Sequence, residues 1–207
     1  MGKFKLHIPL VSVSLYVAFQ LIANILSTKI TVLPLFHLAI DGGTIIYPFT
    51  FTLRDFVHKT WGKNNSRQVV VIAALLNLLM FALFWIIGKF PADASWRYQE
   101  AYENILLPVG RIVAASVIAQ VVSELIDTEV FSWIYRKLND VAGVLVSNFA
   151  GLIVDSLLFS LIAFWGILPV ATVGQIIVAN ILIKLAITII SAPAIKLVPR
   201  TAEFKDI

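Results

Sequence analysis

Six long apolar stretches of this sequence contain ionisable side chains, and this combination limits the chain to very few folds. Eight such residues lie inside the stretches or at their edges: Arg54, Asp55, Arg111, Glu124, Asp127, Glu129, Asp155 and Lys184. An unpaired charge at the centre of a bilayer costs roughly 2.5–3.5 kcal/mol even on the scale derived from insertion experiments. Each group is therefore expected to face a polar interior, a charged partner or the membrane interface. The pattern predicts a multi-pass membrane protein with a polar internal site, of the kind that holds or passes a solute.

The composition is that of a membrane protein with one domain. The 207 residues are 59% hydrophobic and 14% charged, whereas soluble domains carry about 25% charged residues. At about 20 residues per spanning helix, the chain has room for six helices and no extra soluble domain. We therefore expect residues 1–207 to form a single all-α membrane domain. The six predicted helices cover residues 8–26, 43–61, 68–88, 105–135, 142–166 and 171–198.

The basic residues are distributed unevenly between the two sides that these helices define. One side, which includes both termini, holds Lys3, Lys5, Lys59, Lys63, Arg67, Arg136, Lys137, Lys196, Arg200 and Lys205, while the other holds Lys29, Lys89 and Arg97. Cytoplasmic connections carry the excess of lysine and arginine, so both termini are predicted to be cytoplasmic, in an inner membrane. The basic excess behind the net charge of +4 is thus explained by the orientation of the protein among membrane lipids. We therefore expect no nucleic-acid partner.

The first connection, residues 27–43, is apolar in its middle but too short to span a bilayer, and it contains Pro34. Two interpretations stay open: a hairpin or flap packed on the outer mouth, and an ordinary interfacial loop. The segment Asp41-Gly42-Gly43 at its end is interpreted as turn chemistry.

Polar residues form one stripe on each of four predicted helices, because positions three, four and seven apart share a helical face. The stripes are Gln20, Asn24 and Ser27 in the first helix; Ser116, Gln120, Glu124 and Asp127 in the fourth; Asn148, Gly151 and Asp155 in the fifth; and Asn180, Lys184 and Ser191 in the sixth. Four such stripes predict one shared polar interior.

Two interpretations of the charged residues remain open: structural ion pairs, and groups that change partner when a solute enters. Arg54 and Asp55 are adjacent and project about 100° apart, so their partners are expected on other helices. Asp155 and Lys184 are expected to pair across the cavity when it is empty.

The sequence contains no cysteine, and its three histidines lack metal-ligand spacing. Neither a nucleophile elbow nor a phosphate-binding glycine loop is present. We therefore expect no metal, no cofactor and no enzymatic activity, although Glu124 and Asp127 could in principle serve as an acid and a base.

Several segments in order along the chain resemble the queuosine precursor transporter family, also called vitamin uptake transporter-like. The segment from Tyr47-Pro48-Phe49 through Arg54-Asp55 to Trp61-Gly62-Lys63 is similar to the second-helix signature of that family. Further similarities lie in the fourth helix (Arg111, Ser116, Asp127, Val130-Phe131), the fifth (Ser147, Gly151, Asp155, Ala163-Phe164-Trp165) and the sixth (Asn180, Lys184, Pro193). The chain departs from the pattern at Arg54, where Thr is common, and at Lys59, where many members have Glu.

The resemblance implies a six-helix fold similar to the substrate-binding subunits of energy-coupling-factor transporters. It also implies uptake of a small deazaguanine base, 7-cyano-7-deazaguanine or its aminomethyl form. In this interpretation Asp155 or Asp55 accepts the N–H groups of the guanine-like edge, Lys184, Arg111 or Asn24 donates to the keto oxygen, and Phe49, Tyr47 or Phe159 stacks on the ring. The candidate substrate-binding residues are Asp155, Lys184, Arg111, Asp55, Asn24, Gln20, Asn148, Asn180, Glu124 and Phe49.

Two alternatives to a stand-alone transporter remain. One is a binding subunit that requires a separate ATPase module; such subunits often carry Ala-x-x-x-Ala on the first helix, whereas here the spacing occurs only at Ala115 and Ala119. The other is a small membrane-embedded enzyme that acts on lipid. A homo-oligomer also stays open.

Overall fold

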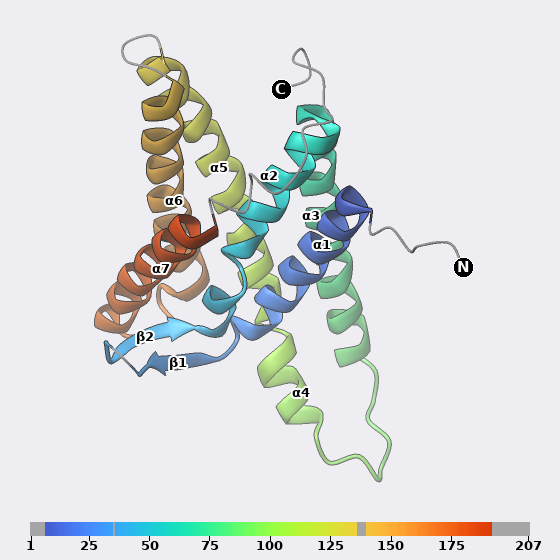
Figure 1. The fold of residues 1–207 in the computed structure, drawn as a ribbon. Coiled ribbons are helices and arrows are strands. Elements are labelled where there is room, and N and C mark those ends of the chain that lie inside the picture. Colours follow the sequence, from blue (N-terminus) through green and yellow to red (C-terminus); the bar gives the residue numbers. More distant parts are fainter. Residues whose placement is uncertain (1–6, 35, 136–139, 192–207) are drawn as a thin grey trace.

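The computed structural model describes residues 7–34, 36–135 and 140–191, with only the backbone described at residues 63, 124–125, 127–135, 140–148 and 191. The described chain is mostly helical and contains one small sheet (Figure 1). In order, the elements are α1 (Ile8–Leu26), β1 (Ile30–Leu33), β2 (Leu38–Asp41), the 3-10 helix η1 (Gly42–Ile45), α2 (Phe49–Trp61), α3 (Lys63–Gly88), α4 (Gln99–Leu106), α5 (Val109–Tyr135), α6 (Asp140–Phe164) and α7 (Val170–Ser191).

Four helical stretches within the described residues are long and apolar enough to cross a membrane. They are Ile8–Leu26, Asn64–Gly88, Gln99–Ser123 and Val170–Ile190, and Phe149–Phe164 is a shorter apolar helix. The helix α2 has 13 residues and is therefore about 20 Å long, less than the roughly 30 Å of a bilayer core. The four long apolar stretches make the protein a multi-pass membrane protein by length and composition.

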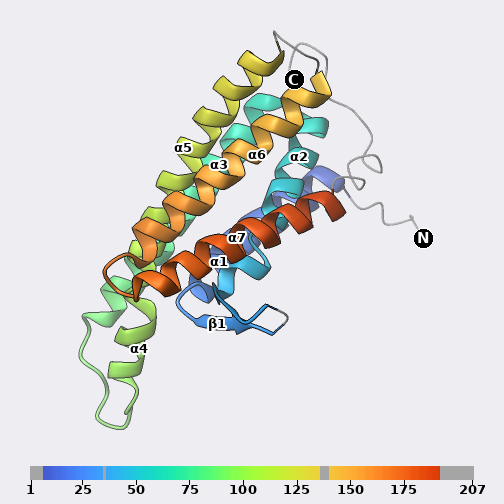
Figure 2. The same ribbon diagram turned by 90° about the vertical axis from the view of Figure 1, so that its left-hand side faces the viewer.

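The helices form two groups that meet at the hairpin end of the molecule. The long helices α5 and α6 lie side by side, α1, α2 and α3 pack together, and α7 crosses obliquely beside both groups (Figure 2). One apolar core joins α5, α6 and α7 through side chains such as Ile112, Phe164 and Ile176. A second core, which includes Tyr16 and Val57, joins α1, α2 and α3. Polar side chains line the space where the groups meet.

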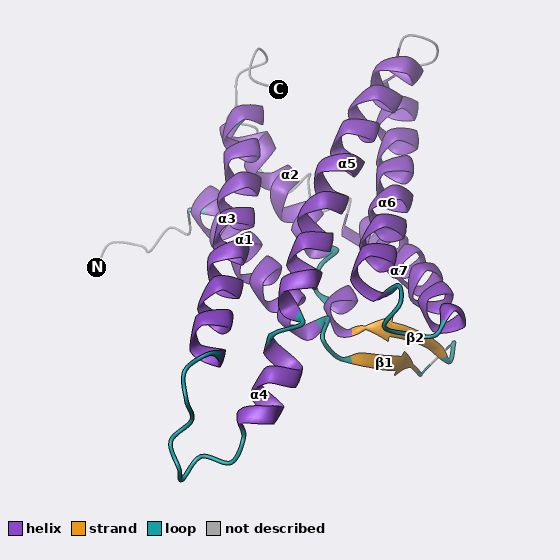
Figure 3. Cartoon of the chain, turned by 180° about the vertical axis from the view of Figure 1, so that it is seen from behind, coloured by secondary structure: helices purple, strands orange, loops and turns teal. Residues whose placement is uncertain are grey.

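The connection after α1 folds as an antiparallel β-hairpin, as one of the two interpretations predicted, and it adds two strands to a chain predicted as all-α (Figure 3). Its register pairs Ile30 with Asp41 and Leu33 with Leu38. The backbone N–H of Ala39 donates to the side-chain oxygen of Gln175 in α7 (3.0 Å). The hairpin is therefore attached to the helix that carries Lys184.

The second helix is shorter than predicted and is followed directly by the third. We expected a helix from residue 43, but Gly42–Ile45 forms a 3-10 turn and α2 begins after Pro48. Proline has no N–H to continue a preceding helix, which explains the late start. Gly62 adopts φ 84° and separates α2 from α3, so α3 begins at residue 63 and not at 68. Such a left-handed backbone favours glycine at a helix end.

The predicted helix 105–135 begins later than expected, as α5 at Val109, and its first two predicted residues belong to the end of α4, a short helix before Pro108 that was not predicted. Pro108 precedes the first residue of α5, a place where its missing N–H costs little. The fifth predicted helix ends slightly earlier than expected, because α6 stops at Phe164, before Gly166 with φ 79°. For the last predicted helix, residues 192–198 lie outside the described residues.

Candidate functional site

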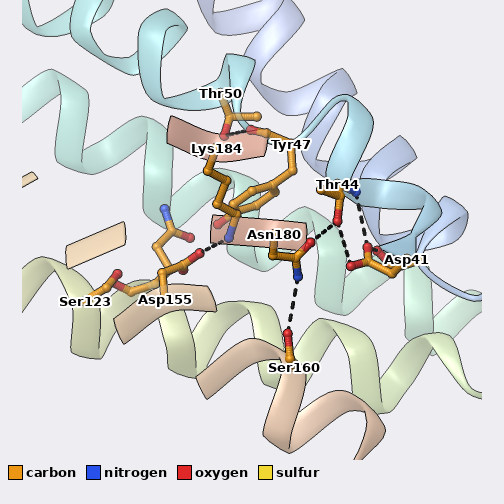
Figure 4. Close-up of polar contacts among 11 residues, drawn as sticks. Asp41, Thr44, Tyr47, Thr50, Ser123, Asp155, Ser160, Asn180 and Lys184 are labelled. Carbon is orange, nitrogen blue, oxygen red and sulfur yellow. Dashed lines mark hydrogen bonds and ion pairs between the residues drawn. The ribbon is translucent and has the colours of Figure 1, made fainter. Parts of the chain in front are cut away.

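A buried ion pair joins α6 and α7 at the place where the helix groups meet. The Nζ of Lys184 lies 2.5 Å from Oδ2 of Asp155, and each side chain is 3% exposed. The predicted pairing of these two residues is therefore present (Figure 4). Removing one member of such a pair is costly because the remaining charge stays buried. Lys184 also lies over the ring of Tyr47, 5.0 Å from its centroid, in cation–π geometry.

The ion pair lines a narrow cavity. Its walls come from α1, the β2–η1 turn, α5, α6 and α7: Ala23, Asn24, Ser27, Asp41, Gly43, Thr44, Tyr47, Ser116, Asp155, Phe159, Asn180 and Lys184. The cavity has a volume of about 20 Å³, which is room for about one water molecule. A larger solute can therefore enter only if some of the lining groups move apart.

A second polar cluster shares this cavity and is centred on Asp41, which is 1% exposed. Its Oδ1 accepts from the Ser27 hydroxyl (2.7 Å) and from the backbone N–H of Thr44 (3.2 Å), and its Oδ2 accepts from the Thr44 hydroxyl (2.8 Å). The Thr44 hydroxyl also contacts Oδ1 of Asn180, whose amide nitrogen donates to Ser160 (3.3 Å). Figure 4 shows Asn180 between this cluster and the ion pair.

Two predicted candidates of α1 are buried, and only one of them lines the cavity. Asn24 does so, and its amide donates to Asn77 of α3 (2.6 Å). Gln20 donates instead to the hydroxyl of Tyr16 (3.3 Å), which also accepts from Gln120 of α5 (3.0 Å). Gln20 thus bonds within α1, and it is the Gln120–Tyr16 hydrogen bond that joins α1 to α5, outside the cavity lining.

Three other candidates do not line this cavity. Arg111 donates to the carbonyl oxygens of Ile162 (2.6 Å) and Trp165 (2.5 Å), so it caps the end of α6. Phe49 is 43% exposed and packs edge-on against Phe19. Asp55 lies on α2 with half of its side chain exposed.

Arg54 and Asp55, for which we expected partners on other helices, also form a long ion pair with each other. The Nη2 of Arg54 lies 3.8 Å from Oδ1 of Asp55, with the side chains 26% and 51% exposed. The arginine side chain is long enough to reach across the 100° between neighbouring helical positions. Two further candidates, Glu124 and Asn148, lie outside the residues whose side chains are described.

Sequence reasoning did not identify Asp41 and Thr44 as site residues. It named Tyr47 as a possible stacking residue but left it out of the candidate substrate-binding residues. The signal that would have found the first two is the spacing Asp-x-x-Thr, because Asp41 caps a turn by accepting from the N–H three residues later. Within the described residues, no group of three or more histidine, aspartate or glutamate side chains gathers as a metal site would require. The groups that line the cavity are hydroxyls, amides, two carboxylates, one amine and two aromatic rings.

Comparison with known proteins places these residues in a family. Residues 41–198 match the family described as "Putative vitamin uptake transporter". The chain is 27% identical over 164 residues to the "Probable queuosine precursor transporter" of Bacillus subtilis (strain 168), an alignment that covers 77% of this chain and 71% of the relative. It is 26% identical over 127 residues to the "Queuosine precursor transporter" of Escherichia coli (strain K12).

The second alignment covers 59% of this chain and about half, 54%, of the relative. No solved structure matches the chain. The family match includes the β2–η1 turn, the ion pair and every helix from α2 onward. Because it spans most of the sequence, the chain belongs to the vitamin uptake transporter family.

Proposed function

We propose that the protein is a stand-alone membrane transporter that takes up a queuosine precursor, a 7-deazaguanine base with a cyano or an aminomethyl substituent. The observation that carries this proposal is the buried Asp155–Lys184 pair in a polar cavity with aromatic walls. The names of the two relatives support the choice of solute. A site built only for stability would not need two aromatic rings and several hydroxyls around its ion pair.

The chemistry of the cavity matches the edge of a guanine-like base. The carboxylate of Asp155 can accept two adjacent N–H groups of the base, and the amine of Lys184 can donate to its keto oxygen. Tyr47 and Phe159, which both line the cavity, can stack on the flat ring system. Each charged group then exchanges its protein partner for a partner on the base, so no buried charge is left unpaired.

The empty cavity is too small for a base, which occupies several times the volume of one water molecule. Loading therefore requires the ion pair to open. This requirement makes the pair a gate as well as a binding site, because only a solute that satisfies both charges can keep them apart.

The stand-alone mode is supported by the position of the alanine pair. Ala115 and Ala119 are both fully buried, so their small side chains serve packing within the protein. A module that docks on Ala-x-x-x-Ala needs these residues on the surface.

We test the proposal with purified protein in lipid vesicles and each labelled base outside. Label is expected to enter protein-containing vesicles and not empty ones, with no ATPase module present, and unlabelled adenine is expected to compete poorly. Uptake that depends on an added ATPase module would instead identify a binding subunit. Chemical conversion of lipid without uptake of base would identify an enzyme.

We further propose six spanning segments, the second made of α2 together with the η1 turn before it, with both termini in the cytoplasm of the inner membrane. The absence of cysteine makes this orientation directly measurable. Ser95→Cys in the connection before α4 and Asn65→Cys at the start of α3 change exposed residues. An impermeant maleimide is expected to label Ser95→Cys in intact spheroplasts, and Asn65→Cys only after the membrane is opened. The reverse pattern would invert the orientation.

A further inference from the structure

The cavity lining carries one negative charge more than the ion pair accounts for. Among its described lining residues, Asp41 and Asp155 are acidic and Lys184 is basic. The ion pair neutralises Asp155 and Lys184. Asp41 is bonded to two hydroxyls and a backbone N–H, all of which are neutral donors. The charges of the described cavity lining are therefore one positive charge short of neutrality.

The charge of Asp41 exceeds what its structural role needs. It caps the turn η1, and asparagine or serine caps a helical turn about as well as aspartate. Burying a carboxylate costs more than burying either of these neutral groups. A carboxylate at a position 1% exposed therefore points to a cation that arrives from outside the protein.

The oxygens around Asp41 are also rich in acceptors. Oδ2 of Asp41 and Oδ1 of Asn180 both accept from the Thr44 hydroxyl. That hydroxyl has a single hydrogen to donate. An ammonium group carries three donors and no acceptor, so it complements this set of oxygens. A nitrile has only an acceptor nitrogen and does not.

We propose that Asp41, with Ser27, Thr44 and Asn180, forms a second subsite that binds a protonated amino group of the solute. This proposal rests on the proposed function and narrows it: the preferred solute is the aminomethyl form, which is cationic at neutral pH like other aliphatic amines. The guanine-like edge binds at Asp155 and Lys184, and the ammonium binds at Asp41. Because a membrane potential that is negative inside draws a cation inward, uptake of this form needs no coupling ion.

The test is a comparison of both bases on purified protein at pH 7, in sodium-free buffer and again with sodium added. The wild type is expected to bind the aminomethyl form at least about tenfold more tightly than the cyano form, as a buried charge-assisted contact allows. Asp41→Asn keeps a capping oxygen and removes the charge. We expect it to abolish the preference, because binding of the aminomethyl form should weaken at least about tenfold more than binding of the cyano form. Asp93→Asn, at an exposed carboxylate before α4, is the matched control and is expected to keep the preference.

Three outcomes would overturn the inference and leave the proposed function standing. They are equal binding of both forms by the wild type, an equal loss of both forms in Asp41→Asn, and binding of the cyano form that requires sodium in the wild type but not in the variant. If neither base binds the wild type, the proposed function fails as well. Thermal unfolding checks that Asp41→Asn is folded, and Asp41→Ser, which also caps without charge, replaces it otherwise.

Discussion

Replacing Lys184 with methionine is expected to abolish uptake and to destabilise the protein. The substitution keeps most of the length of the side chain but leaves the carboxylate of Asp155, 3% exposed, without its cation. Removal of one partner from a buried pair costs about 3–5 kcal/mol. It also removes the donor that we assign to the keto oxygen of the base. Vesicle uptake should fall to the level of empty vesicles, and the unfolding temperature in detergent should drop.

The double variant Asp155→Asn/Lys184→Met separates stability from transport. Because it removes both charges together, it should unfold at a higher temperature than Lys184→Met alone, since a buried pair is often replaceable by neutral groups. Uptake should nevertheless stay at background. The matched control is Lys89→Met, which removes an exposed lysine that lies over the Trp85 ring and should transport normally. If the double variant regains uptake, the pair is structural and does not bind the base.

Gly43→Ala is expected to damage the site without removing any polar group. A Cβ at residue 43 would overlap the Ser27 hydroxyl and lie 2.5 Å from the backbone oxygen of Ala23. The backbone of α1 cannot yield easily, so the turn η1 must shift away from it and carry Thr44 and Tyr47 along. Overpacking of this kind costs about 1–3 kcal/mol. We expect affinity for the base to fall roughly tenfold, which corresponds to about 1.4 kcal/mol of binding free energy.

The matched control for this variant is Gly174→Ala in α7. A Cβ at residue 174 meets no atom within 4 Å, and alanine is favoured over glycine in a helix by about 0.5–1 kcal/mol. The control should therefore be at least as stable as the wild type and bind the base normally. Equal binding by Gly43→Ala and the wild type would show that the close approach of the turn to α1 is not needed.

Part of the polar interior was predictable from the sequence, because helical periodicity places the polar residues of each helix on one face. The first helix has the predicted bounds, and Gln20, Asn24 and Ser27 are all buried on it. The same reasoning on the last two helices brought Asp155 and Lys184 to one cavity. Within a regular helix, spacing determines the shared face, so no knowledge of the tertiary fold was needed.

Residues outside regular helices were not predictable in this way. Asp41 and Thr44 reach the cavity because the hairpin folds back on α1 and α7, and this depends on contacts distant in sequence, such as Ala39 with Gln175. Arg111 has a side chain suited to binding a polar solute, yet its guanidinium donates to backbone carbonyl groups at the end of α6. Which partner a long side chain reaches, and which side chain bonds the free carbonyl groups of a helix end, depend on tertiary packing. Helical periodicity does not predict that packing.

The two-stranded hairpin limits how deeply this end of the protein can sink into lipid. Each of its strands has one edge without a strand partner among the described residues, and hydrocarbon does not tolerate unpaired backbone groups. We therefore expect the hairpin to lie at the level of the lipid headgroups. The cavity begins within one helical turn of the end of α1, at Asn24 and Ser27. A solute would thus descend only a short distance to be captured, and most of the bilayer would remain to be crossed after capture.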